Sequence, residues 1–213
     1  MKKNYLLIFL CVFATVSVWA IDTPESVERH LMFSGDNFFQ GRIWTPATAL
    51  FIHGDLAHLF GNMLFLYVFG NTLEDVIGAK KTIAMFFLGG GLSFLLSLFL
   101  YDWNVPMIGA SAAIFTLTAV VMLAKPLRFS LLFMLPVGLV AMVYFTYNVM
   151  AVFYGVGGNI AYASHVIGFS IGIPFGIAWS PKWARNLLIT IGLLAVYIIV
   201  TLALETLLFS GPF

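Results

Sequence analysis

The last apolar segment of the chain, residues 187–209, reads LLITIGLLAVYIIVTLALETLLF and contains one charged residue, Glu205. An α-helix needs about 20 consecutive apolar residues to cross the hydrocarbon core of a bilayer, because each residue advances it by about 1.5 Å. The length and composition of this segment are therefore typical of a membrane-spanning helix. Glu205 lies close enough to its outer end for the carboxylate to reach the polar interface.

Six further segments have the same apolar character. In order they are residues 4–21, 56–78, 82–101, 106–124, 129–153 and 160–179. The whole sequence is 62% hydrophobic and 9% charged, whereas about 25% of the residues of a soluble domain are charged. A chain of 213 residues cannot bury so much apolar surface within itself. We therefore predict an all-α integral membrane protein whose seven spans form one polytopic domain over residues 1–213.

Charge and cysteine content exclude several other classes of protein. The net charge is +1 and no basic stretch is present, which argues against a nucleic-acid partner. The single cysteine, Cys11, lies within an apolar run, so neither a disulfide framework nor a thiolate metal site is expected. We expect no cofactor and no metal, and nothing in the sequence indicates an oligomeric state.

Lysine and arginine are distributed unevenly between the loops. With a cytoplasmic amino terminus and seven crossings, only Arg29 and Arg42 lie outside. The other eight basic residues lie inside: Lys2, Lys3, Lys80, Lys81, Lys125, Arg128, Lys182 and Arg185. This distribution follows the positive-inside rule. Because the sequence has no added soluble domain or targeting presequence, we expect a multi-pass protein of a prokaryotic cell membrane.

The first segment has a second interpretation. Lys2 and Lys3 precede an apolar run that ends at Val18-Trp19-Ala20, a pattern that also resembles a cleavable signal peptide. Retention as a span agrees with the charge distribution, and we expect it. Cleavage would leave six spans in the same orientation.

Polar side chains within spans are costly, so each of them is a functional candidate. Four such residues fall near one shallow depth on the outer side: His58, Asn62, Ser111 and His165. With helices that begin near residues 106 and 160, Ser111 and His165 both lie about 7 Å below the outer ends of their spans. His58 and Asn62 lie about 5 and 10 Å down the second span, on one face because they are four residues apart.

These residue types suit nucleophilic catalysis. A serine hydroxyl becomes a good nucleophile when a neighbouring imidazole accepts its proton. No acidic residue lies at this depth beside His165, so we predict a Ser111–His165 dyad. His58, the amide of Asn62 and the backbone N–H of Ser111 are candidate donors to an oxyanion.

Small residues surround the predicted pair. Ser111 lies within Gly109-Ala110-Ser111-Ala112-Ala113, and Gly168, Gly172 and Gly176 recur at intervals of four in the sixth span. This spacing lets membrane helices pack backbone to backbone, so we predict a seam between these two spans. The alternative is that the glycines and the serine serve packing alone.

Four short motifs follow one another along the chain. They are WTPATALFIHG at residues 44–54, HLFGNM at 58–63, Gly109-Ala110-Ser111, and HVIG at 165–168 with Gly172. In this order and on these spans, the motifs resemble those of the rhomboid family of intramembrane serine proteases. The resemblance covers residues 44–176, which is most of the chain.

The resemblance implies a six-helix transmembrane core, here about residues 4–179, with one additional C-terminal helix at 187–209. It implies an intramembrane serine endopeptidase that cleaves the transmembrane segments of single-span membrane proteins near the extracytoplasmic face. Ser111 would be the nucleophile and His165 the general base, with His58 and Asn62 near the oxyanion. The substrate helix would have to unwind, because an intact helix keeps its carbonyl groups bonded internally.

Supporting roles follow from the same resemblance. His53 would structure the first loop, Glu74 would tie helices together, and Phe115 would pack against the imidazole. Gly109, Gly168 and Gly172 would allow close approach of the backbone.

The sequence also departs from the family pattern. Ala112 replaces a frequent glycine after the nucleophile, and Ser164 replaces a common alanine before the histidine. Thr45 stands where the first-loop motif often has an arginine, unless Arg42 takes that role.

The residues that several other membrane functions require are absent from the sequence. Asp102 lies at a span boundary and no Gly-x-Gly-Asp follows, which excludes an aspartyl intramembrane protease; no His-Glu-x-x-His supports a zinc protease. All six lysines lie at cytoplasmic ends, which excludes a retinal protein. Two alternatives remain: an inert rhomboid-like protein that binds membrane helices, and a small transporter or channel for which Glu205 would be the best evidence.

Overall fold

The computed structural model describes residues 2–21, 24–156 and 161–209. In these ranges the chain is almost entirely helical, and the strands that are described, β1 (Phe129–Ser130) and β2 (Leu135–Pro136), form one small antiparallel hairpin. The predicted fold class, an all-α membrane protein, is confirmed.

Each predicted segment contains an apolar helix. The first is α1 (Asn4–Trp19), and the second consists of α5 (Leu56–Phe65), the π-helical turn η2 (Leu66–Gly70) and α6 (Asn71–Ile77). The remaining segments are α7 (Ala79–Ser97), α8 (Ser111–Ala124), α9 (Val137–Phe153), α10 (Tyr162–Trp179) and α11 (Trp183–Phe209). Between α1 and α5 lie the short helices α2 (Pro24–Leu31), α3 (Gly35–Phe39), α4 (Thr45–Thr48) and η1 (Ala49–Phe51).

Helix length distinguishes two groups among these segments. In the described ranges, four helices are long and apolar enough to cross a membrane: Leu56–Ile77, Ala79–Ser97, Tyr162–Trp179 and Trp183–Leu208. Helices α1, α8 and α9 are apolar but shorter, with 16, 14 and 17 residues. The chain is a multi-pass membrane protein, and the number of seven crossings stays a prediction.

Two predicted helix starts are wrong. The fourth segment was expected to begin near Pro106, but Gly109 adopts a φ of +104° and α8 begins only at Ser111. Ser111 is therefore the first residue of its helix, and the depth estimated from five residues of helical rise does not hold. In the fifth segment the β1–β2 hairpin precedes α9, which starts after Pro136. The start expected for the sixth segment, Ile160, lies outside the described residues.

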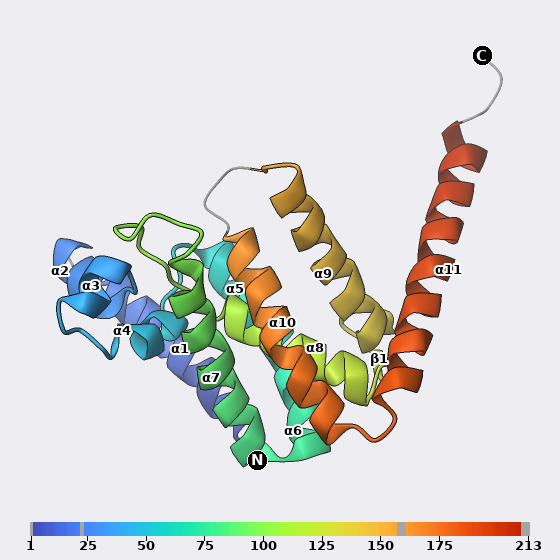
Figure 1. The fold of residues 1–213 in the computed structure, drawn as a ribbon, viewed down its shortest axis with the longest axis horizontal. Helices are drawn as coiled ribbons and strands as arrows, with labels where there is room; N and C mark the ends of the chain where they lie inside the picture. Colours follow the sequence, from blue (N-terminus) through green and yellow to red (C-terminus); the bar gives the residue numbers. More distant parts are fainter. Residues whose placement is uncertain (1, 22–23, 157–160, 210–213) are drawn as a thin grey trace.

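Helix α8 lies at the centre of the bundle, packed against α7, α9 and α10 (Figure 1). Every residue from Ala112 to Leu123 is buried. At the edge, α11 leans away from α9 (Figure 1) and contacts the bundle near its own beginning. There Asn186 Nδ2 donates to the carbonyl oxygens of Leu123 and Ala124, at 2.7 and 3.2 Å, and so caps the end of α8.

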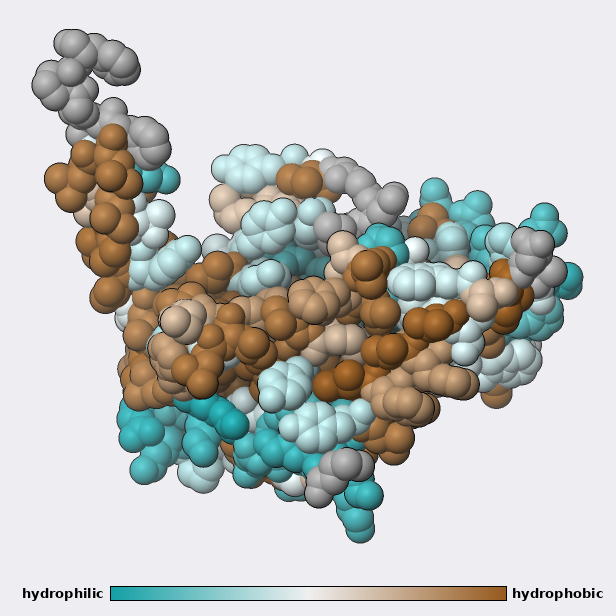
Figure 2. Space-filling view, turned by 180° about the vertical axis from the view of Figure 1, so that it is seen from behind, coloured by the Kyte–Doolittle hydropathy of each residue, from teal (hydrophilic) through white to brown (hydrophobic). Residues whose placement is uncertain are grey.

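Apolar side chains cover much of the outer surface. Figure 2 shows them as a broad brown band across the molecule, with hydrophilic residues gathered below it. Large apolar side chains stay exposed on α1 and α11, for example Phe13 at 62% and Leu207 at 78%. Such a surface suits a lipid environment and would be unfavourable in water.

Helix α1 is joined to the second segment at its first turn. The two carboxylate oxygens of Glu74 accept the backbone N–H groups of Lys3 and Asn4, each at 2.8 Å. Because the first N–H groups of a helix have no partner within the helix, Glu74 completes the start of α1 from α6. The neighbouring Asp75 pairs with Lys2 at 2.9 Å and with Arg128 at 2.8 Å. Glu74 thus connects α6 to the start of α1.

Candidate active site

Ser111 and His165 meet between α8 and α10. The hydroxyl oxygen of Ser111 lies 2.7 Å from Nε2 of His165, a hydrogen-bonding distance. Ser111 begins α8, and His165 lies in the first turn of α10, three residues after Tyr162. Both residues are half-buried rather than sealed in the interior. The proximity predicted from the sequence is therefore present in the fold.

The glycines of α10 make this approach possible. A methyl group at Gly168 would overlap the carbonyl oxygen of Ala112, and one at Gly172 would overlap the carbonyl oxygen of Thr116. Thr116 Oγ1 also donates to the carbonyl of Gly168 at 2.8 Å, which joins the two backbones across the seam. Any larger residue at Gly168 or Gly172 would push α10, and with it His165, away from α8.

The imidazole of His165 is held on two further sides. The ring of Phe115 stacks on it, with centroids 4.7 Å apart and planes 9° from parallel. On the other side, Nδ1 of His165 lies 2.7 Å from Oδ1 of Asn148, a residue of α9 that is 3% exposed. Nδ2 of Asn148 donates to the carbonyl of Tyr144 at 2.8 Å.

Asn148 was not among the residues predicted from the sequence, although a signal was present. It is an asparagine in an apolar span, five residues before the end of the fifth segment at Phe153. With an outward-running span, that offset corresponds to about 7 Å, the depth that singled out His165. Applied to every span, the search for polar groups at one depth would have found it.

Residues of α5 lie against the loop that precedes Ser111. Asp55 accepts the backbone N–H of His58 at 2.7 Å and so caps the start of α5. A Cβ at Gly109 would lie 2.7 Å from Nε2 of His58 and 3.9 Å from Nδ2 of Asn62. Both predicted oxyanion donors thus face the backbone two residues before Ser111, where φ of +104° and this close contact require glycine.

His53 is positioned by helix α1, which packs beside η1. Its ring is 1% exposed, with Nδ1 lying 3.1 Å from Oγ1 of Thr15 and Nε2 accepting the N–H of Ala110 at 3.4 Å. Oγ1 of Thr15 also donates to the carbonyl of Phe51 at 3.0 Å. These bonds require a proton on Nδ1 of His53. Burial, with a smaller effect of His58, lowers the pKa of His53 to about 3, so this ring is neutral near pH 7.

The residues that depart from the family pattern form contacts of their own. Ser164 shares a 2.7 Å hydrogen bond with Ser97, which joins α10 to α7. Arg42 donates to the side chains of Asn37 and Gln40, at 3.2 and 2.9 Å, within the loop that contains α3. Thr45 is fully buried and donates to the carbonyl of Arg42 at 2.9 Å.

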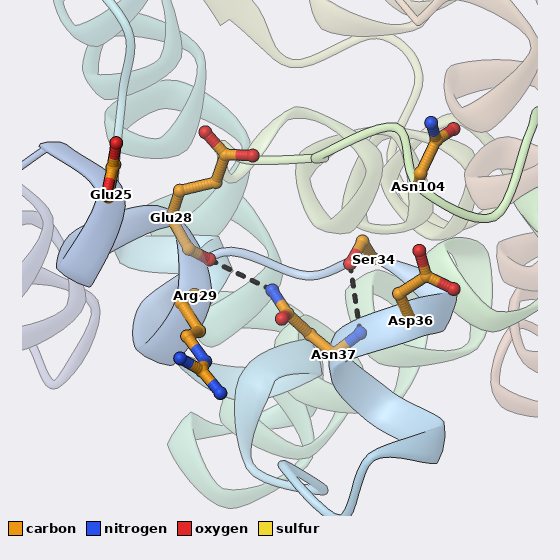
Figure 3. A pocket seen from close by; sticks show the side chains of 7 residues that line it. All are labelled: Glu25, Glu28, Arg29, Ser34, Asp36, Asn37 and Asn104. Carbon is orange, nitrogen blue, oxygen red and sulfur yellow. Dashed lines mark hydrogen bonds between the residues drawn. The ribbon is translucent and has the colours of Figure 1, made fainter.

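A polar pocket lies elsewhere, beside α2 and α3 (Figure 3). Its volume is about 300 Å³, and neither Ser111 nor His165 contributes to it. Its lining residues are Glu25, Glu28, Arg29, Ser34, Asp36, Asn37 and Asn104. In the described part of the chain, no group of three or more histidine, cysteine, aspartate or glutamate side chains is placed to hold a metal ion.

Comparisons with known proteins match the same part of the chain. The mitochondrial RHOMBOID-like protein 12 of Arabidopsis thaliana is 30% identical over 82 residues, 37% of this chain and 24% of the relative. Rhomboid-like protease 3 of Toxoplasma gondii is 33% identical over 93 residues, 42% of this chain and 35% of the relative. The chloroplastic Rhomboid-like protein 11 of Arabidopsis thaliana is 35% identical over 108 residues, 44% of this chain and 38% of the relative.

These alignments cover well under half of each relative, so the names describe proteins to which the chain is similar in part. The broader match is to the family model of the Rhomboid domain, which aligns with residues 40–182. That range contains the motifs of the first loop and of α5, the Gly-Ala-Ser stretch and all three glycines of the α10 seam. With a match over most of its length, the chain belongs to the rhomboid family.

Proposed function

We propose that the protein is an intramembrane serine endopeptidase whose nucleophile is Ser111 and whose general base is His165. The observation that carries this proposal is the 2.7 Å contact between Ser111 Oγ and His165 Nε2 in a half-buried position. Family membership supports a rhomboid role, and one relative is named a protease. An inert helix-binding relative would have no need for a serine and an imidazole in this geometry.

The chemistry follows from the positions of the protons. His165 Nε2 accepts the proton of Ser111 as the oxygen attacks the substrate carbonyl, and the imidazolium then gives that proton to the leaving amine. The resulting acyl ester is hydrolysed when His165 takes a proton from water and returns it to Ser111. The negative oxygen of each tetrahedral intermediate would be stabilised by the Ser111 N–H and by His58 and Asn62, which lie beside Gly109.

Water and substrate must both reach this pair. Gly54 and Asp55, just before α5, are exposed, and the proposed entry for water lies beside them, on the side of the loop that contains His53. The proposed substrates are single-span membrane proteins whose helix unwinds near its outer end, because a scissile carbonyl must first leave its helical hydrogen bond. Glycine, proline or polar residues in that helix would lower the cost of unwinding.

The proposed topology has a cytoplasmic amino terminus and an active site open to the opposite side. The distribution of lysine and arginine supports it. The cell membrane of a prokaryote is the proposed location, although the two plant relatives are named mitochondrial and chloroplastic.

Covalent labelling tests the proposed activity. A fluorophosphonate should label the wild-type protein in detergent, and Ser111→Ala and His165→Ala should each abolish the labelling. Ser170→Ala serves as the matched control, because Ser170 is an exposed serine of α10 that donates to the carbonyl of Val166 at 2.8 Å. Absence of wild-type labelling in a folded sample would favour a binding protein.

Cleavage of a reconstituted single-span substrate tests the substrate class. Wild-type protein should release a fragment cut near the outer end of the span, and Ser111→Ala should not. Replacement of that part of the substrate by a leucine-rich helix should slow cleavage strongly. Cleavage at an unchanged rate would contradict the requirement for unwinding.

A further inference from the structure

Asn148 occupies the position of a third member beside Ser111 and His165. It comes from α9, whereas the other two residues come from α8 and α10. Its Oδ1 lies 2.7 Å from Nδ1 of His165, while Nε2 of the same ring lies 2.7 Å from Ser111 Oγ. The three side chains therefore form one continuous hydrogen-bonded row across three helices.

The orientation of the Asn148 amide is determined by its second bond. A backbone carbonyl accepts hydrogen bonds and does not donate them, so the group of Asn148 that faces the carbonyl of Tyr144, 2.8 Å away, must be the NH₂. Its carbonyl oxygen must then face His165. An amide oxygen only accepts, so the proton of a neutral His165 ring lies on Nδ1. This leaves the lone pair of Nε2 directed at the hydroxyl of Ser111.

We propose that Asn148 is a positioning residue that holds His165 in the tautomer and the ring orientation that a general base for Ser111 needs. This inference rests on the proposed serine peptidase function and replaces a free-standing dyad by a Ser111–His165–Asn148 arrangement. Asn148 does not exchange a proton with the substrate. Its bond also becomes stronger when His165 takes up the proton of Ser111, because a charged donor forms the stronger hydrogen bond.

Because Asn148 is buried, few other groups can replace its oxygen as the acceptor for His165. Asn148 is 3% exposed, so little water is available to replace its oxygen beside Nδ1. Phe115 covers one face of the ring and offers no acceptor. Without Asn148, the Nδ1–H would be left without its acceptor, and the ring would gain from turning or from moving its proton to Nε2. Either change removes the base from Ser111.

The first test measures reactivity with a fluorophosphonate. Asn148→Leu removes the acceptor with little change in volume, and we expect the maximal labelling rate to fall by about 10- to 100-fold, the cost of a hydrogen bond to a charged group. The concentration of fluorophosphonate that gives half the maximal rate should change little. Asn148→Asp keeps an acceptor oxygen and should label faster than Asn148→Leu, although a carboxylate is the less favourable group in an apolar span.

A matched control separates positioning from stability. Asn186, near the start of α11, is also 3% exposed and also donates to backbone carbonyls, but it lies at the opposite end of α8. Asn186→Leu should lower the thermal unfolding temperature and leave the labelling rate of the folded protein unchanged. If Asn148→Leu labels at the wild-type rate, the inference is wrong. It is also wrong if the labelling rates of Asn148→Asp and Asn148→Leu differ only as the stabilities of the two variants differ.

The second test does not depend on activity. Imidazole ¹⁵N chemical shifts of His165, assigned by comparison with His165→Gln, report which ring nitrogen carries the proton. In Ser111→Ala protein the proton should lie on Nδ1, and the added change Asn148→Leu should shift it in part to Nε2. A wild-type ring protonated on Nε2 would overturn the inference. Absent labelling of wild-type protein combined with the Nδ1 tautomer would instead contradict the proposed function alone.

Discussion

Helices α8 and α11 are both strongly apolar in sequence, yet they occupy opposite environments. All residues of α8 from Ala112 to Leu123 are buried, whereas α11 exposes large side chains along most of its length, including Leu188 at 70% and Ile199 at 65%. The difference lies in residue size and not in hydrophobicity. Helix α8 has alanine, serine and threonine where neighbours approach, while α11 is built mainly of leucine, isoleucine and valine.

This contrast has a physical basis in the membrane. Lipid tails are as apolar as leucine, so hydrophobicity does not drive one membrane helix onto another. Helices associate where small residues permit close contact and where polar groups find partners across the interface. The α8–α10 seam has both features, in Gly168, Gly172 and the Thr116 hydroxyl. The site is therefore located at one end of the seam along which α8 and α10 pack.

Glycine substitutions should give the largest effect in this comparison. Gly168→Leu inserts a side chain whose first carbon already overlaps the carbonyl of Ala112, so α10 must move outward. We expect loss of fluorophosphonate labelling and a free energy of unfolding lowered by about 3 kcal/mol or more, the upper end for overpacked cores.

The control for this substitution is Gly192→Leu in α11. Among the described residues, and apart from its chain neighbours and the nearby backbone of its own helix, nothing lies within 4 Å of the Cβ position at Gly192, so that change should leave both labelling and unfolding near wild type. Equal losses in the two variants, measured by labelling and by unfolding in detergent, would contradict the contrast between the helices.

Leucine-to-alanine substitutions in the two helices should change stability by a smaller amount. Leu117 in α8 is fully buried, and Leu202 in α11 is 56% exposed. In a bilayer the transfer from water contributes little, so Leu117→Ala loses mainly the packing around a cavity, and we expect a cost of about 2 kcal/mol. Leu202→Ala exchanges one lipid-facing side chain for another and should cost less than about 0.5 kcal/mol. Unfolding in detergent or in steric-trap assays measures both, and a larger loss for Leu202→Ala would reject the explanation.

The same physics explains which features could be predicted from the sequence. Apolar segments mark helices because lipid forbids unpaired backbone groups, so the all-α class and all seven apolar segments were recognisable. The spacing of Gly168, Gly172 and Gly176 indicated which face of α10 meets α8. Helix starts were less accessible, because the position where α8 begins depends on the φ of Gly109 and not on hydropathy.

Side-chain partners from distant spans were the least predictable part. Ser111 and His165 were identified by residue type and depth, and Phe115 and Glu74 through motif position. Depth alone would have marked Asn148 as a candidate, but its pairing with His165 could be foreseen only by knowing that α9 lies beside α10. Thr15 was not found because one threonine in an apolar helix usually bonds to its own backbone. Here its hydroxyl donates to Phe51 and accepts from His53 instead.

The smallest predicted effect concerns α1, which combines the properties of the two helices. Its outward face is exposed like that of α11, yet Thr15 is fully buried and reaches the site through His53 and the N–H of Ala110, next to Ser111. Thr15→Val preserves shape and removes the hydroxyl. We expect a loss of about 1 kcal/mol of stability and a fall of several-fold in labelling, because His53 loses the acceptor of its Nδ1–H. Thr201→Val is the matched control on α11, where the hydroxyl donates to the carbonyl of Tyr197 in its own helix, and both properties should stay at wild-type values. If Thr15→Val lowers stability without slowing labelling, the first helix supports the fold but does not position the loop before the serine.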